Sequence, residues 1–249
     1  MRHTLPLPDE DIVEIDGVPV TSMDRTIIDL SRFTVPLDAL VSADHALALG
    51  SAVDRFDRAG TESRARAIRT RWRRRLENLP VRARGARSAR SVIDWSVAWS
   101  ESARETWLRW VVLTWGRRDV VAQCPVVVPG TTYFTDLALR DGLLPDGSPR
   151  WSHQEYDGEG KFGMTGLERR TVLHEQERRE RAITALGHDV VRFDRDDGIS
   201  ATDAVRRIRA TLRHSLEHPL EPVADLLPRR SQLARTRWTA PEPIVLRQD

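Results

Sequence analysis

The alternation of apolar and polar residues predicts a β-hairpin near the start of the chain. Two short β-prone runs, residues 12–15 and 18–20, flank Asp16-Gly17. An Asp-Gly pair between such runs is the usual signal for a two-residue hairpin turn. With the helices that follow it, the hairpin predicts a small α+β region over residues 1–60, which holds too little apolar surface to fold convincingly alone.

Helical periodicity dominates the next part of the chain. Thr21 or Ser22 can cap a first helix, and a second helix is expected to begin at Pro36 and to end at Gly50. Residues 61–99 form an arginine-rich helical region that is interrupted near 78–80 and at Gly85. This region therefore connects the α+β region to the second half of the chain.

The second half alternates between helical and strand-like patterns. Apolar residues recur every three or four positions over 102–115, and two apolar runs separated by Pro129-Gly130 then predict a second hairpin. The expected order is helix, three strands, helix, strand and helix, with approximate ranges 102–115, 120–128, 133–139, 151–156, 167–186, 189–193 and 200–216. This order predicts an α/β domain over 100–217, with a mixed sheet flanked by helices, and a flexible tail over 218–249.

Composition fits a globular chain with a charged surface. Apolar residues make up 40% and charged residues 31% of the 249 positions. No apolar run approaches the roughly 18 residues of a membrane span, and the first residues do not resemble a signal peptide. Cys124 is the only cysteine, which excludes an internal disulfide and a cysteine-based zinc site. We therefore expect a cytoplasmic protein with no membrane partner.

Charge is distributed unevenly although the net charge is only +2. Residues 1–50 are acidic, whereas residues 61–95 are rich in arginine. Such a block can neutralise nucleic-acid phosphates, which makes DNA an expected partner. The arginines expected to contact DNA are Arg64, Arg71, Arg73, Arg74 and Arg75. The alternative is that these arginines simply form the solvated surface of a helix.

Four carboxylates carry the chemical prediction. Asp136 interrupts an otherwise apolar strand, where an acid is costly unless it has a partner. Glu155 and Asp157 leave the next strand two residues apart, and Glu105 on the preceding helix can reach the same sheet edge. Oxygen ligands of this kind suit Mg²⁺ or Mn²⁺, which can activate water for hydrolysis.

Each of these residues also has an ordinary interpretation. Asp157 begins a common Asp-Gly turn, while Glu105 and Glu155 can be surface acids. Lys161 is the only lysine among 39 basic side chains, and it can stabilise negative charge in a transition state or be there by chance. His153 and His174 are isolated in the sequence, so both are expected at the surface.

Several segments resemble a known nuclease group. The segments are 101–106 (ESARET), 134–138 (FTDLA), 155–158 (EYDG) with 161–163 (KFG), 176–181 (QERRER) and 185–193 (ALGHDVVRF). In this order they are similar to the very-short-patch-repair-like endonuclease domain of the PD-(D/E)XK superfamily. Upstream, 18–22 (VPVTS) and 25–30 (RTIIDL) look like the linker of actinobacterial AbiEi-type antitoxins. The chain begins just before this linker, so we expect it to lack the winged helix that precedes the linker in that group.

The resemblance implies a restriction-endonuclease-like fold and a DNA-directed role. It implies Asp136, Glu155 and Asp157 as metal ligands, with Glu105 assisting. The chain departs from the superfamily pattern in two ways: the stretch between Asp136 and Glu155 is longer, and Asp157 stands where a lysine is usual, so that Lys161 would have to replace it.

Three functional hypotheses follow. The first is a metal-dependent DNA endonuclease-like protein, linked to phage defence or to toxin–antitoxin systems. The second is a non-catalytic, DNA-binding, antitoxin-type transcriptional regulator, whose activity would need the arginines of 64–75 but not the acids. The third is the remnant of a truncated gene, which would not fold cooperatively.

Overall fold

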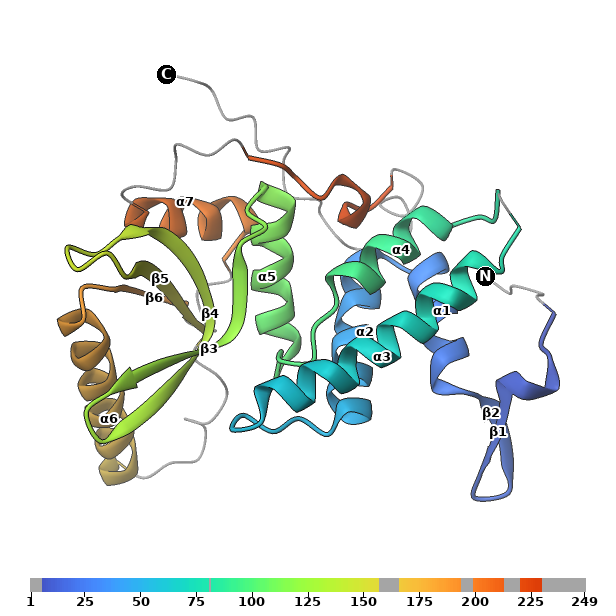
Figure 1. Cartoon of the computed structure of the whole chain (residues 1–249), viewed down its shortest axis with the longest axis horizontal. Coiled ribbons are helices and arrows are strands. Elements are labelled where there is room, and N and C mark those ends of the chain that lie inside the picture. The colour runs from blue at the N-terminus through green and yellow to red at the C-terminus, as the bar shows by residue number, and fades with distance from the viewer. Residues whose placement is uncertain (1–5, 81, 157–165, 194–198, 213–219, 230–249) are drawn as a thin grey trace. The chain divides into compact units, whose positions relative to one another are not determined.

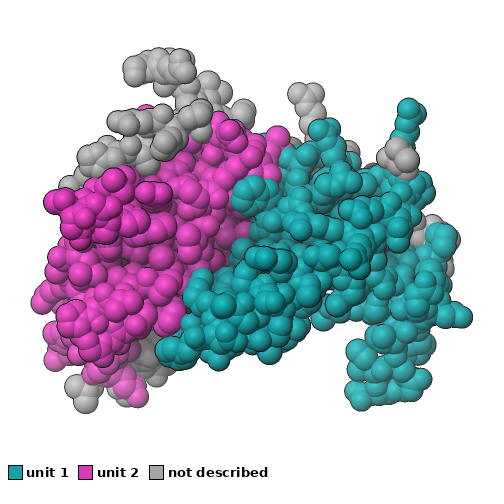
Figure 2. Space-filling view, viewed as in Figure 1, with its two compact units in different colours: residues 1–99, 225–237 teal, residues 100–224, 238–249 magenta. Residues whose placement is uncertain are grey.

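The structure is a computed structural model that describes residues 6–80, 82–156, 166–193, 199–212 and 220–229. The chain divides into two compact units. Unit 1 consists of Met1–Trp99 with Asp225–Arg237, and unit 2 of Ser100–Ala224 with Trp238–Asp249 (Figure 2). The described elements include both helices and strands in a mixed α/β arrangement.

The predicted N-terminal hairpin is present in unit 1. Strands β1 (Ile12–Ile15) and β2 (Val18–Thr21) pair antiparallel, with Ile15 opposite Val18. Asp16 and Gly17 both have positive φ, at 50° and 78°. This is the conformation that a two-residue turn needs to match the twist of its strands.

Four helices form the core of unit 1: α1 (Met23–Phe33), α2 (Pro36–Ser51), α3 (Arg58–Glu77) and α4 (Ala86–Trp95). Ser22 caps α1, since its hydroxyl accepts from the backbone N–H of Arg25 at 3.3 Å. The buried faces include Ile28, Leu40, Leu47, Trp72 and Ile93. The apolar periodicity of these segments is thus explained by packing between helices.

Gly50 does not end α2, contrary to the sequence prediction. The helix continues to Ser51, and Ala52 follows in the left-handed conformation with φ 46°. A Cβ atom on Gly50 would lie 2.8 Å from the Cδ1 atom of Ile68 in α3. The glycine thus lies at a close approach to the side chain of Ile68 in α3, within α2 and not at its end.

Unit 2 contains a four-stranded mixed sheet (Figure 1). Its strands are β3 (Val120–Val128), β4 (Thr131–Leu143), β5 (Pro149–Tyr156) and β6 (Asp189–Phe193), in the order β3-β4-β5-β6. Strand β4 is antiparallel to both β3 and β5, and β6 runs parallel to β5. The parallel pair is made possible by the long connection that contains α6.

Three helices cover this sheet: α5 (Ala103–Trp115), α6 (Gly166–Ala185) and α7 (Ala201–Thr211). Helices α5 and α7 contact each other, and α5 contacts β3 and β4. Helix α6 contacts β3 and β6, and Figure 1 shows it on the side of the sheet away from α5. The sheet is therefore covered on both faces.

Only one end of α6 is buried as the sequence predicted. Ile183 is 1% exposed and packs with Val126 and Val128 of β3. Leu173 and Leu186, which were also expected to face inward, are 43% and 38% exposed. Of the three leucine and isoleucine side chains expected to face inward, only Ile183 is buried, and Leu186 lies just beyond the end of α6.

A buried ion triad fastens the ends of three strands in unit 2. Arg150 of β5 forms ion pairs with Asp141 of β4 and Asp189 of β6. Its Nε also donates to the carbonyl oxygen of Gly187 at 3.2 Å. Asp141 is fully buried, so its charge depends on this arginine.

Replacing Arg150 with Met is therefore expected to lower the free energy of unfolding by about 3 kcal/mol or more, because Asp141 would remain buried without its cation. Urea denaturation followed by circular dichroism measures this change. Arg206→Met is the matched control, since Arg206 is 73% exposed in its pair with Asp203 and its loss should change little. Equal effects of the two substitutions would contradict a structural role of the triad.

Candidate functional site

The N-terminus of α5 places Glu105 inside unit 2. Ser102 caps the helix: its hydroxyl accepts from the backbone N–H of Glu105 at 3.2 Å and donates to Oε1 of the same residue at 3.0 Å. The backbone N–H of Glu101 donates to Oε2 of Glu105 at 2.9 Å. This reciprocal cap fixes the carboxyl group, and Glu105 is only 8% exposed.

Asp136 of β4 lies close enough to Glu105 to affect its ionisation. Burial raises the pKa of Glu105 to about 7, and the negative charge of Asp136 adds to this rise, while the hydrogen bonds from Glu101 and Ser102 oppose it. Asp136 itself accepts a hydrogen bond at Oδ2 from the backbone N–H of Tyr156, at 2.7 Å. The structure thus brings together two of the four predicted carboxylates.

Gln123 of β3 belongs to the same site, although sequence reasoning missed it. Ala122 pairs with Leu137 and Cys124 with Thr135, so the register sets Gln123 opposite Asp136. Gln123 is 3% exposed, and its Nε2 lies 3.5 Å from Oε2 of Glu105. The signal was available in the sequence, because Gln123 interrupts an apolar strand in the same way as Asp136.

Glu155 has a different partner. It is buried near the end of β5, and Oε1 of its carboxylate lies 2.6 Å from Nη2 of Arg179 in α6. Arg179 also donates to the carbonyl oxygen of Phe134, and its guanidinium lies over the ring of Tyr133 at 5.8 Å. The charge of Glu155 is therefore offset by Arg179 of α6, whereas Glu105 belongs to α5.

The remaining predicted residues of this site, Asp157 and Lys161, lie outside the described residues. Among the residues that the structure describes, no group of three or more His, Cys, Asp or Glu side chains could hold a metal ion. Glu105 and Asp136 supply the type of oxygen donor that suits Mg²⁺, which proteins often hold through one or two carboxylates together with substrate phosphate. A cation beside this pair would take the place of the proton that burial keeps on Glu105.

Most arginines predicted to contact DNA have carboxylate partners in unit 1. Asp24 pairs with Arg71 and Arg75, and Asp11 also pairs with Arg75. Burial alone would raise the pKa of Asp24, but hydrogen bonds from Arg71 and Trp72 outweigh it and hold the pKa below its ordinary value. The acidic and basic blocks of the sequence thus neutralise each other in space.

Arg64, Arg73 and Arg74 complete the predicted DNA-contacting set. Nε of Arg64 donates to the carbonyl oxygen of Ser51 at 2.6 Å, and Nε of Arg73 donates to Asp94 at 2.7 Å. Arg74 is exposed on α3. Of these three side chains, Arg74 is the one whose position best suits contact with a phosphate in solution.

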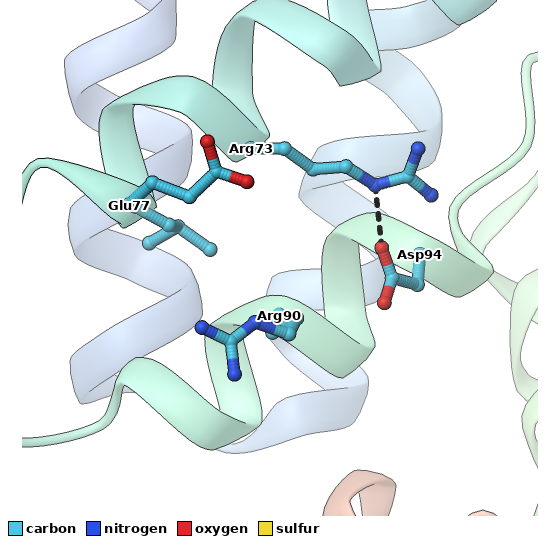
Figure 3. Close-up of a pocket in the computed structure, with 5 residues that line it drawn as sticks. Arg73, Glu77, Arg90 and Asp94 are labelled. Atoms are coloured by element: carbon cyan, nitrogen blue, oxygen red, sulfur yellow. Dashed lines mark hydrogen bonds and ion pairs between the residues drawn. The ribbon is translucent and has the colours of Figure 1, made fainter.

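Arg73 also lines a surface cavity of about 230 Å³ in unit 1 (Figure 3). The lining residues are Arg73, Leu76, Glu77, Arg90 and Asp94. Figure 3 shows Arg73 directed to Asp94, with Arg90 and Glu77 on the other side of the opening. Two arginines and two acids leave this cavity without an excess of positive charge for an anionic ligand.

His153 is buried, so its expected position at the surface is wrong. It is 1% exposed, and its Nδ1 lies 2.8 Å from the hydroxyl of Thr135. Burial lowers the pKa of His153 to about 3, with smaller contributions from His188 and Arg179. The ring is therefore neutral at physiological pH. An isolated histidine in the sequence gave no indication of this burial, which results from the pairing of β4 with β5.

No protein-family model, curated protein or solved structure matches the chain. None of the helices within the described ranges is long and apolar enough to cross a membrane. The function of the chain must therefore be inferred from the geometry of the site and from the sequence segments that resemble the nuclease group.

The raised pKa of Glu105 predicts a pH-dependent stability. The unfolded chain releases this proton near pH 4.5 and the folded protein near pH 7, so stability falls as the pH rises between these values. Relative to Glu105→Gln, wild type should lose about 2 kcal/mol of unfolding free energy between pH 5 and pH 8. Urea denaturation at both pH values measures the difference. A constant difference between the two proteins would contradict the raised pKa.

Proposed function

We propose that unit 2 is a metal-dependent endonuclease-like domain of the PD-(D/E)XK type, which hydrolyses DNA phosphodiester bonds. The observation that carries this proposal is the Glu105–Asp136 pair: Glu105 of α5 is buried, and the negative charge of Asp136 of β4 is near enough to act on it. The charge of Asp136 disfavours the ionised form of Glu105, and a divalent cation bound beside them would favour it.

The order of elements in unit 2 supports a restriction-endonuclease-like fold for this domain. Helix α5 precedes three antiparallel strands, and α6 leads to the parallel strand β6. The three acids that the sequence resemblance implies and the structure describes belong to α5, β4 and β5. Fold alone does not establish activity, so the proposal depends on these side chains.

In the proposed mechanism, Glu105 and Asp136 would hold the cation, with the amide of Gln123 beside them. When bound, Mg²⁺ supplies an activated water and offsets negative charge on the phosphoryl oxygens. The backbone N–H of Tyr156 donates to Oδ2 of Asp136, and this hydrogen bond orients the carboxylate. Glu155 can join this set only if its ion pair with Arg179 opens, and Asp157 and Lys161 remain predictions from the sequence.

Nicking of supercoiled DNA in Mg²⁺ or Mn²⁺ tests the proposal. Asp136→Asn and Glu105→Gln are each expected to reduce the rate by about 100-fold or more, because each removes a charge that holds the cation. Glu177→Gln on the exposed surface of α6 is the matched control and should cut like wild type. Folded wild-type protein that does not cut, or acid variants that cut normally, would overturn the assignment.

A second candidate is a non-catalytic, DNA-binding regulator of the antitoxin type. The observation that favours it is the ion pair between Glu155 and Arg179, which neutralises one of the implied metal ligands without a metal. In this case unit 2 would act as a scaffold, and the arginines of α3 would supply the contact with DNA.

This candidate predicts that Arg74→Ala weakens DNA binding uniformly across sequences. The slope of the logarithm of the binding constant against the logarithm of salt concentration should also become shallower by about one, which corresponds to one released counterion. Fluorescence anisotropy with labelled duplexes at several salt concentrations measures both quantities. Arg71→Ala is a useful comparison, because Arg71 pairs with Asp24 and its loss should mainly reduce stability. Unchanged affinity for Arg74→Ala would contradict DNA contact through this face of α3.

A further inference from the structure

Gln123 has a backbone conformation that its sequence position does not explain. Its φ is 47°, in the left-handed region, although it lies within strand β3 and carries a side chain. A residue of this kind in a strand is strained by about 1 kcal/mol or more, and such strain persists only where the surrounding structure enforces it. Its cause must therefore be found in the neighbouring residues.

The strained residue coincides with the two acids of the site. The ladder between β3 and β4 contains the pairs Ala122–Leu137 and Cys124–Thr135, and it is interrupted at the intervening row, which holds Gln123 and Asp136. At the same position, the side-chain Nε2 of Gln123 lies 3.5 Å from Oε2 of Glu105 on α5. The backbone of Gln123 is thus not part of the regular ladder, and its buried side-chain amide lies next to the carboxyl group of Glu105.

We propose that Gln123 is a positioning residue that holds the carboxyl group of Glu105 beside Asp136, and that the local strain of β3 is retained for this purpose. The inference rests on the proposed function for its role in catalysis. An amide suits the task, because it donates a hydrogen bond to the carboxyl group of Glu105 without adding a charge to the site. Gln123 acts through Glu105 and does not itself react.

The test uses two substitutions that tolerate a positive φ. Gln123→Gly removes the side chain and relieves the strain, and Gln123→Asn keeps an amide that is one methylene too short to reach Glu105. Both are expected to reduce metal-dependent nicking by about 100-fold, the size of effect that a misplacement of about 1 Å can cause. The melting temperature of Gln123→Gly should stay within about 4 °C of wild type, because relief of strain offsets lost packing.

Ala52→Gly is the matched control. Ala52 has nearly the same φ, 46°, but lies in unit 1 at the end of α2. This variant should match or exceed wild type in melting temperature and should cut DNA at the wild-type rate. A structural role of Gln123 alone would make Gln123→Gly behave like Ala52→Gly, and full activity of Gln123→Gly would overturn the inference while leaving the proposed function intact.

A double-mutant cycle separates this inference from the proposed function. Melting temperatures are measured for Gln123→Gly, Glu105→Gln and the double variant in the full chain without added metal. If Gln123 holds Glu105, the shift of the double variant should differ from the sum of the single shifts by about 4 °C or more. Additive shifts would overturn the inference. If wild type does not cut DNA, the proposed function fails, and the cycle still decides whether Gln123 positions Glu105.

Discussion

A carboxylate inside a protein needs a compensating partner, and this requirement organises both units of the chain. Asp141 is fully buried and is held by Arg150, Asp11 lies between Arg25 and Arg75, and Glu155 is paired with Arg179. Glu105 differs from these acids. Burial raises the pKa of Glu105 to about 7 and the negative charge of Asp136 adds to this rise, while the hydrogen bonds from Glu101 and Ser102 only partly oppose it. This contrast is the physical reason why the cation is proposed to bind beside Glu105 rather than beside another buried acid.

The same requirement changes the meaning of the charge distribution. In the sequence, an acidic block precedes an arginine-rich block, which suggested a surface for nucleic acid. In the folded unit, Asp24 of α1 forms ion pairs with Arg71 and Arg75 of α3, so residues of the two blocks belong to one ionic network. Arginines that hold such acids contribute to the stability of the helices and are less available to phosphates. Any DNA contact by unit 1 must therefore use exposed side chains such as Arg74.

Strand β3 shows a local irregularity at the place where chemistry is proposed. A strand of apolar residues would pair more regularly with β4 if it had no residue with positive φ, yet Gln123 has one. Conflicts between local preference and tertiary structure are expected at functional sites, where other interactions compensate for them. Here the compensation comes from α5, whose cap fixes Glu105 within reach of the Gln123 amide. The site thus depends on three elements that are separated in the sequence.

Local signals in the sequence were sufficient for the elements and their order. The Asp16-Gly17 turn, a helix cap at Thr21 or Ser22 and the strand Asp189–Phe193 were each predicted from residues close together in the chain, and the structure has the turn, the cap at Ser22 and the strand. Distant contacts decided the rest. Gly50 lies inside α2, close to the side chain of Ile68, and His153 is buried because its strand lies within the sheet. The sequence identified Asp136 because an acid interrupts an apolar strand, and Glu105 because its helix could bring it to the same sheet edge, but it could not assign their partners. Pairing Glu105 with Asp136 and Glu155 with Arg179 requires the strand register and the two helices that cover the sheet, because a partner is set by distance in space and not by distance along the chain.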